Sequence, residues 1–290
     1  MKKLRLCKQI KFRLLLILFC AQCLSAQNPY RPAVFEVVSS RILEPSFLKV
    51  QYTMTFRGLD ENDPQRLTDT RTVLIGKSFR KDSSYWMDKR ESDNIERKAK
   101  GEMLFLSTES TIYPLDIMVG GEKDRILHRT LMNGPVLCYE IEHPALKWNL
   151  QTGDTTLLGY RCKQAATEYK GRSYVAWYAE DIPVNAGPYV FDGLPGLILK
   201  IASTDGDYCW ESKGLEESKE PIVVKGYGGK TKECTYAEAR RIMENVYQHP
   251  YRYALQFVRS IRVRDAAGGT RDAGEKEFAI SYFYNPIEKE

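Results

Sequence analysis

Residues 187–201 read Gly187-Pro-Tyr-Val-Phe-Asp-Gly-Leu-Pro-Gly-Leu-Ile-Leu-Lys-Ile201, and the predicted fold is organised around this central stretch. Its middle, Leu194-Pro195-Gly196-Leu197, predicts a type II turn, because proline presets the backbone of the second position and glycine takes the positive φ of the third without strain. The apolar run 197–201 that follows is too short for an independent helix. We therefore expect a tight reversal that leads into a buried strand.

The segments around the central stretch have the alternation of strands. Residues 48–57 alternate apolar and polar side chains, which is the period of a strand with one buried face. Residues 160–168 and 173–178 are expected to pair as a hairpin through a glycine-containing turn at 170–171. Similar short runs recur along the chain. The predicted fold class is mainly β (α+β), built as an antiparallel, meander-like sheet, a sandwich or a half-barrel.

At least one C-terminal helix is expected to pack against these strands. Thr235 and Glu238 have the spacing of a capping box, in which each side chain bonds the backbone N–H of the other residue. Apolar residues then recur at helical spacing as far as Pro250. Nearer the N-terminus, residues 85–87 are interpreted as a strand piece, and the highly charged residues 88–101 as a solvated loop or a short surface helix.

The first 26 residues have the pattern of a secretory signal. A basic segment precedes the apolar run 14–20, and a membrane-spanning helix would need roughly 20 apolar residues. The expected organisation is a signal peptide at 1–26, cleaved near Ala26, and a single β-rich domain at 27–290. The expected location is the periplasm or the extracellular space.

Removal of the signal changes the charge balance. Six of the 43 basic residues and none of the 38 acidic residues lie in it, which leaves 37 basic residues against 38 acidic ones. The basic net charge, which was the main argument for a nucleic-acid partner, is therefore absent after cleavage. No other stretch is long and apolar enough to span a membrane. Cys20 and Cys23 raise a lipoprotein alternative, but Phe19 and Gln22 before them are poor matches for the small residue that lipoprotein processing prefers.

Four cysteines follow the signal: Cys138, Cys162, Cys209 and Cys234. An even number in an oxidising compartment favours disulfides, with three pairings open. Cys138 with Cys162 is the first choice, because both fall on strands that we expect to be neighbours; unpaired buried thiols are the alternative. The separations lack the close Cys-x-x-Cys spacing of zinc sites, so no metal and no cofactor is expected.

The sequence contains no recognisable catalytic motif. None of the histidines lies in a metalloprotease helix motif or beside a serine in a nucleophile elbow; they are His128, His143 and His249. Glu180, Asp181 and Asp192 flank the central stretch and would supply the two carboxylates that glycoside hydrolysis requires. Nothing in the sequence fixes their separation. Solvated loop carboxylates are preferred, and no catalytic residue is assigned.

Aromatic side chains gather near the central stretch and form the candidate ligand-binding surface: Trp148, Trp177, Tyr189 and Phe191. Large aromatic faces suit an apolar or peptide ligand, but they also fill the core of β-sheet proteins. Core filling is the preferred interpretation, and a ligand surface is the alternative.

The hexapeptide 193–198, here called the central motif, consists of Gly193, Leu194, Pro195, Gly196, Leu197 and Ile198. It resembles the signature of the GLPGLI family of envelope proteins from Bacteroidetes-type bacteria. Ordered similarities extend upstream to Trp148 and include the ending 284–288. The resemblance implies an exported, β-rich protein that is suspected of serving outer-membrane or transport machinery. It lends no catalytic residues, since the family has no established activity.

Three functional classes follow from these observations. They are an exported binding or carrier protein for an apolar or peptide ligand, an accessory partner of an outer-membrane or transport protein, and an unrecognised periplasmic hydrolase that uses carboxylates near the central motif. The side chains of the motif are apolar and contain no group that could act as an acid, a base or a nucleophile. A non-catalytic binding or accessory module is therefore the expected function, and an enzyme is less favoured.

Overall fold

The structure is a computed structural model that describes residues 29–58, 60–62, 64–108, 110–130, 134–257, 262–264, 270–272 and 281–290. The predicted signal peptide and its cleavage point lie outside the described residues. A twelve-stranded sheet dominates the described chain, and a mainly β fold is confirmed.

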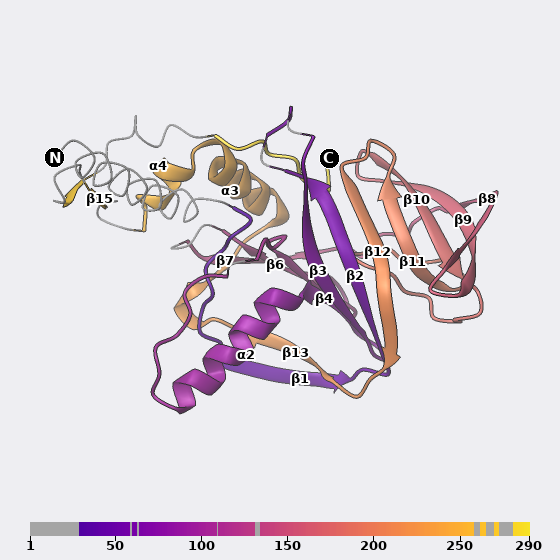
Figure 1. Cartoon of the computed structure of the whole chain (residues 1–290), viewed down its shortest axis with the longest axis horizontal. Coiled ribbons are helices and arrows are strands. Elements are labelled where there is room, and N and C mark those ends of the chain that lie inside the picture. Colours follow the sequence, from indigo (N-terminus) through magenta and orange to yellow (C-terminus); the bar gives the residue numbers. More distant parts are fainter. Residues whose placement is uncertain are drawn as a thin grey trace, which may run out of the picture.

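The order of strands across this sheet is β14 (Thr231–Glu233), β7 (Val136–Ile141), β6 (Asp124–Arg129), β5 (Leu115–Val119), β4 (Arg80–Ser84), β3 (Arg66–Ile75), β2 (Leu48–Arg57), β12 (Tyr208–Glu217), β11 (Leu197–Ser203), β10 (Arg172–Ala179), β9 (Tyr160–Tyr169) and β8 (Asn149–Leu157). Neighbours are antiparallel except β14 and β7, which are parallel. Strands β2 to β7 form one meander and β8 to β12 another, and the two meet where β2 pairs with β12 (Figure 1). The predicted meander is thus confirmed, in an open sheet.

The described residues also form two short ribbons, three α-helices and one 3-10 turn. These are β1 (Ser39–Pro45) with β13 (Pro221–Gly226), β15 (Arg262–Arg264) with β16 (Thr270–Asp272), α2 (Tyr85–Ala99), α3 (Tyr236–Gln248), α4 (Pro250–Ala254) and η1 (Gly228–Lys230). Figure 1 shows α2 beside the β1–β13 ribbon, with α3 towards the other end of the central strands. Among the described helices, none is long and apolar enough to cross a membrane.

The alternation predicted on residues 48–57 is confirmed in β2. Val50, Tyr52, Met54 and Phe56 are at most 1% exposed, whereas the residues between them are partly exposed. The Tyr52 hydroxyl donates to the carbonyl of Ile198 at 2.7 Å. Because Ile198 belongs to β11, this bond joins the two meanders across one shared core.

The predicted capping box is confirmed at the start of α3. The Thr235 side chain accepts from the Glu238 N–H, and the Glu238 carboxylate accepts from the Thr235 N–H at 2.8 Å. Ala239, Met243 and Val246 then face the main core, as the apolar periodicity predicts.

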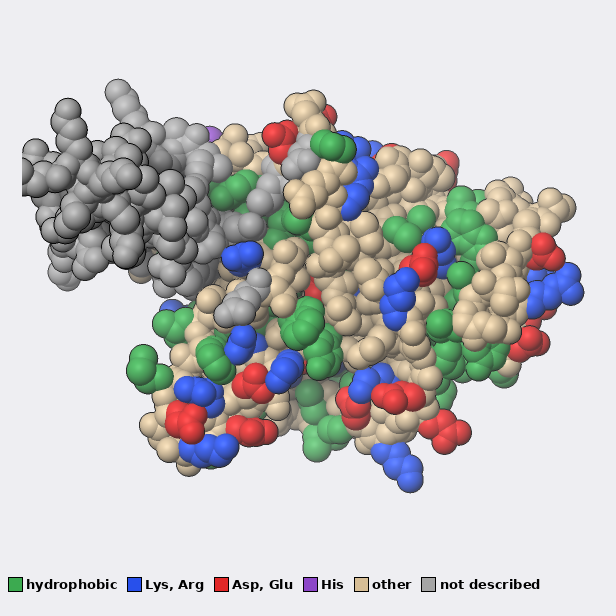
Figure 2. All heavy atoms as spheres, viewed as in Figure 1, with side chains coloured by type: hydrophobic (Ala, Val, Ile, Leu, Met, Phe, Trp, Pro, Cys, Tyr) green, Lys and Arg blue, Asp and Glu red, His purple; other side chains and the backbone are tan. Residues whose placement is uncertain are grey.

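Residues 85–87 are not a strand piece, because they begin helix α2. The charged segment after them is helical, and the stripe that faces inward is Met87, Glu91 and Asn94. Two of these three buried residues are polar, so apolar periodicity could not reveal the helix. Figure 2 shows acidic and basic side chains interspersed over the outer face of this region, with apolar groups between them.

Candidate functional site

The central motif forms the end of the β10–β11 loop and the start of β11. Gly193 has a φ of +87°, whereas Gly196 has no positive φ, so the predicted type II turn at Gly196 is wrong. Glycine is needed there for a different reason: a Cβ on Gly196 would lie 2.2 Å from the carbonyl oxygen of Ala179. The Leu197 N–H donates to the Ile182 carbonyl at 3.0 Å. The motif is therefore a close approach of two backbone segments.

Asp192, directly before the motif, lies in a chain of alternating charges. Its carboxylate is 3.1 Å from Arg80 Nη1 and 3.1 Å from His143 Nε2, and His143 Nδ1 is 2.7 Å from the Asp124 carboxylate. Hydrogen bonds with Asp124 and Asp192 raise the pKa of His143 to about 9. Burial acts to raise the pKa of Asp192, but His143 and Arg80 outweigh it and hold that pKa below its usual range. Both ring nitrogens of His143 are occupied.

The other carboxylates of the predicted hydrolase alternative have different surroundings. Glu180 is paired with Lys163 of β9 at 2.6 Å, and Asp181 is exposed. A glycosidase needs one carboxyl group whose pKa is raised so that it can act as an acid. The pKa of Asp192 is shifted in the opposite direction.

Strand β4, which supplies Arg80, was missed by the sequence analysis. Its five residues are all polar and all buried. Alternate side chains point to opposite faces of a strand. On one face Asp82 accepts the backbone N–H of Tyr189 at 2.7 Å, and on the other the Ser83 hydroxyl donates to Asp88 of α2 at 2.6 Å. By hydropathy such a run reads as a loop, so no sequence signal marked it.

Glu91 is the centre of a second buried network, between α2 and the sheet. Its carboxylate pairs with Arg129 at 3.0 Å and with Lys225 at 2.6 Å, and the Tyr227 hydroxyl donates to it at 2.9 Å. Arg129 also lies 2.6 Å from Asp116. These ion pairs and the hydrogen bond hold α2 against the sheet.

The four aromatic candidates do not form one surface. Tyr189 and Phe191 are buried in the main core. Trp148 is partly buried and donates its indole N–H to the Asp192 carbonyl at 2.7 Å, which fixes the loop before the motif. Trp177 is also partly buried, on β10. Core filling is thus the role of at least Tyr189 and Phe191.

All four candidate cysteines, Cys138, Cys162, Cys209 and Cys234, are free thiols in the structure. Cys138 on β7 and Cys162 on β9 are not on neighbouring strands, since eight strands lie between them in the sheet order. The Cys234 N–H instead donates to the Cys138 carbonyl at 3.0 Å. Within the described ranges, no group of three or more His, Cys, Asp or Glu side chains could hold a metal ion.

A further polar site holds residues 284–290, here called the C-terminal segment, which forms no strand. Arg172 of β10 contacts three successive residues of it. The guanidinium donates to the carbonyl of Pro286 at 2.9 Å and to that of Ile287 at 3.1 Å. It also donates to the side-chain oxygen of Asn285.

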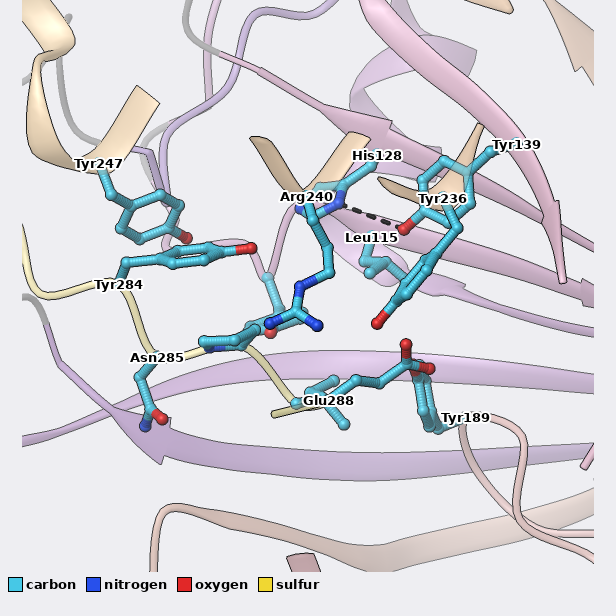
Figure 3. Close-up of a pocket in the computed structure, with 13 residues that line it drawn as sticks. Leu115, His128, Tyr139, Tyr189, Tyr236, Arg240, Tyr247, Tyr284, Asn285 and Glu288 are labelled. Atoms are coloured by element: carbon cyan, nitrogen blue, oxygen red, sulfur yellow. Dashed lines mark hydrogen bonds between the residues drawn. The ribbon is translucent and has the colours of Figure 1, made fainter. Parts of the chain in front are cut away.

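The carboxylate of Glu288, the next residue, lies in a cage of hydrogen-bond donors. The hydroxyls of Tyr169 and Tyr189 donate to one carboxylate oxygen at 2.6 and 2.7 Å, and the Lys170 amine donates to the other at 2.8 Å. Burial acts to raise the pKa of Glu288, but hydrogen bonds from Lys170, Tyr169 and Tyr236 outweigh it and hold that pKa below its usual range. Figure 3 shows Tyr236 and Tyr189 directed at this carboxylate. A buried carboxylate is therefore kept ionised by its surroundings.

A cavity of about 40 Å³ remains between the C-terminal segment and α3. This volume holds two or three water molecules, so it excludes an organic ligand while the segment is in place. Six tyrosines contribute to its wall: Tyr113, Tyr139, Tyr189, Tyr236, Tyr247 and Tyr284. Burial lowers the pKa of His128 in the same wall to about 4, which leaves its imidazole neutral. Arg240 of α3 points into the cavity (Figure 3).

Sequence analysis did not single out the residues that hold the C-terminal segment. Arg172 and Lys170 appear in the sequence as ordinary strand-end and turn residues. The available signal was the resemblance noted at residues 284–288, which include the caged Glu288.

Comparisons with known proteins give a family match over part of the chain. A family model described as a protein of unknown function (Porph_ging) matches residues 161–200. These residues run from β9 through β10 and the central motif into β11, and they include Tyr169, Lys170 and Arg172. No curated protein matches.

Two of the solved structures that match are titled "Structure of PNGF-II in P21 space group" and "Structure of PNGF-II in C2 space group". The first is 12% identical with a TM-score of 0.46, over 70% of this chain and 34% of that chain. The second is 13% identical with a TM-score of 0.46, over 70% of this chain and 33% of that chain. The chain thus spans about a third of these structures, and a likeness at this level assigns neither fold nor function.

Proposed function

We propose that this protein is an exported, non-catalytic binding or accessory module of the cell envelope. The observation that carries the proposal is that the family-matched residues 161–200, together with α3, surround an irregular peptide segment with polar donors. Holding an irregular segment by many directed hydrogen bonds is binding chemistry, and none of these bonds activates a nucleophile.

The state of His143 supports the non-catalytic part of the proposal. A general base must have a nitrogen free to accept a proton from the reacting group. The pKa of His143 is about 9 and both of its nitrogens face carboxylates, so it is protonated and engaged at neutral pH. Asp192 is ionised and paired with Arg80, which removes it as a general acid.

The location and partner classes rest on the sequence. We propose a periplasmic or secreted protein whose partner is an outer-membrane or transport protein, or an apolar or peptide ligand. N-terminal sequencing of protein from the native envelope should begin close to Gln27. A mature species that retains the basic residues before the apolar run 14–20 would contradict export.

A turnover assay tests the non-catalytic proposal. The purified protein, incubated with envelope glycans and peptides, should release no product above the buffer control. Native mass spectrometry of the same protein isolated from its envelope should show a bound ligand or partner. Product release that is lost in Asp192→Asn at an unchanged melting temperature would replace the proposal with the hydrolase alternative.

A further inference from the structure

The C-terminal segment is held by hydrogen bonds to four parts of the fold. The Lys289 N–H donates to the Lys170 carbonyl at 2.9 Å. At its end, the Tyr236 hydroxyl and the Arg240 guanidinium of α3 each donate to a segment carbonyl at 3.1 Å. The Tyr208 hydroxyl of β12 donates to the carbonyl of Asn285. Such docking of an irregular chain, which bends at Ile287, resembles peptide recognition more than strand pairing.

Each side chain of the C-terminal segment has different contacts with the rest of the fold. The amide of Asn285 accepts from Arg172 and donates to Asp207 at 3.0 Å, so both of its ends are used. Proline at the next position has no N–H that would need a partner. Ile287 is buried in the main core. These contacts therefore select an amide at the first position and an apolar side chain at the third, and they tolerate a proline between them.

The cage around Glu288 then requires a carboxylate. A neutral side chain in place of Glu288 would keep the segment bound but leave the hydroxyls of Tyr169 and Tyr189 and the Lys170 amine without a charged acceptor. Buried donors without a partner are costly, and hydrogen bonds that involve charged groups are about twice as strong as neutral ones. An occupant with a carboxylate at this position is consequently preferred over any neutral one.

We propose that this C-terminal pocket, formed by Tyr169, Lys170, Arg172, Tyr189 and Tyr236, recognises an acidic segment of a partner protein of the type Asn-Pro-apolar-Glu. The chain's own residues 285–288 occupy the pocket as a built-in competitor. This inference rests on the proposed binding function and names its site and ligand. Since a tethered segment acts at an effective concentration in the mM range, a partner binds only where its segment displaces the tethered one.

The test uses a fluorescent peptide with the sequence of residues 281–290 and the full-length chain. The double variant Asn285→Ala/Glu288→Gln weakens the tethered segment and should bind the peptide at least tenfold more tightly than the wild type, whose pocket is filled. A peptide with the Glu288→Gln change should bind the double variant about tenfold more weakly, because it loses the charge-assisted bonds. A peptide with Glu290→Gln is the matched control and should bind like the original.

A change in the pocket separates recognition from general stability. Adding Lys170→Met to the double variant should reduce the preference for the glutamate peptide over its glutamine counterpart, while the two tyrosine hydroxyls maintain the rest of it. If the double variant does not fold alone, peptide added during refolding should restore its folded fraction. A folded double variant that binds no peptide, or an unfolded one that peptide fails to restore, would overturn the proposal. A concentration-dependent wild-type dimer with exchanged segments would assign the pocket to a second copy and also overturn it. None of these outcomes bears on export or turnover, which test the proposed function separately.

Discussion

Gly196 lies against the backbone of the preceding strand, and this contact leaves no room for a side chain. A Cβ there would lie 2.2 Å from the Ala179 carbonyl oxygen, and backbone cannot give way as a flexible side chain can. We expect Gly196→Ala to lower the free energy of unfolding by at least about 2 kcal/mol, measured by urea denaturation. Gly214→Ala, where a Cβ meets nothing within 4 Å, should stay within about 1 kcal/mol of the wild type. Equal effects of the two changes would contradict the steric explanation.

His143 should make stability depend on pH above neutrality. Its folded-state pKa is raised from 6.5 to about 9, so its contribution is fully present below pH 6.5 and is lost as the pH rises through 9. The melting temperature of the wild type should therefore exceed that of His143→Gln most at pH 6, and the difference should shrink towards pH 10. A difference that stays constant over this range would show that the imidazole is not protonated between its two carboxylates.

At the scale of elements, α2 depends on buried charge rather than on an apolar stripe. Removing one partner of a buried ion pair leaves the other charge uncompensated, at a cost of about 3–5 kcal/mol. Glu91→Gln should cost about 3 kcal/mol, the lower end of this range, because Glu91 faces both Arg129 and Lys225 but these keep Asp116 and Asp88 as partners. Glu96→Gln on the exposed side of the same helix should change stability by less than about 0.5 kcal/mol. Urea denaturation compares the stability of the two variants. Similar midpoints would contradict a stabilising role of the buried network around Glu91.

The contrast between α3 and α2 explains which elements the sequence could predict. Local signals determine α3: a capping box at Thr235 and apolar residues at helical spacing. In α2 and β4 the inward-facing residues are largely polar and are compensated by residues far away in the chain, as Glu91 is by Lys225. Neither propensity nor periodicity contains that information. From sequence alone α2 and β4 are therefore interpreted as loops, because the residues that pair with their buried polar side chains are identified only in the folded structure.

At the scale of the whole molecule, the two meanders and the C-terminal segment share one core. The β-rich class and the hairpin of β9 and β10 follow from patterns within about twenty residues. The pairing of β2 with β12, and the docking of Glu288 on Tyr169, join residues more than a hundred positions apart. Sequence patterns do not fix such contacts. The candidate site could therefore be predicted only as separate pieces: the central motif, Asp192 and the 284–288 ending.

We propose that the polar residues around the motif maintain the structure and do not perform catalysis. Asp192→Asn tests it most directly, through its melting temperature and its turnover of envelope glycans and peptides in parallel. The change removes the charge that faces Arg80 and His143. We predict a loss of about 2 kcal/mol, since the pair is partly exposed, and no turnover in either protein. An unchanged melting temperature, combined with the loss of a hydrolytic activity that the wild type possesses, would contradict the claim.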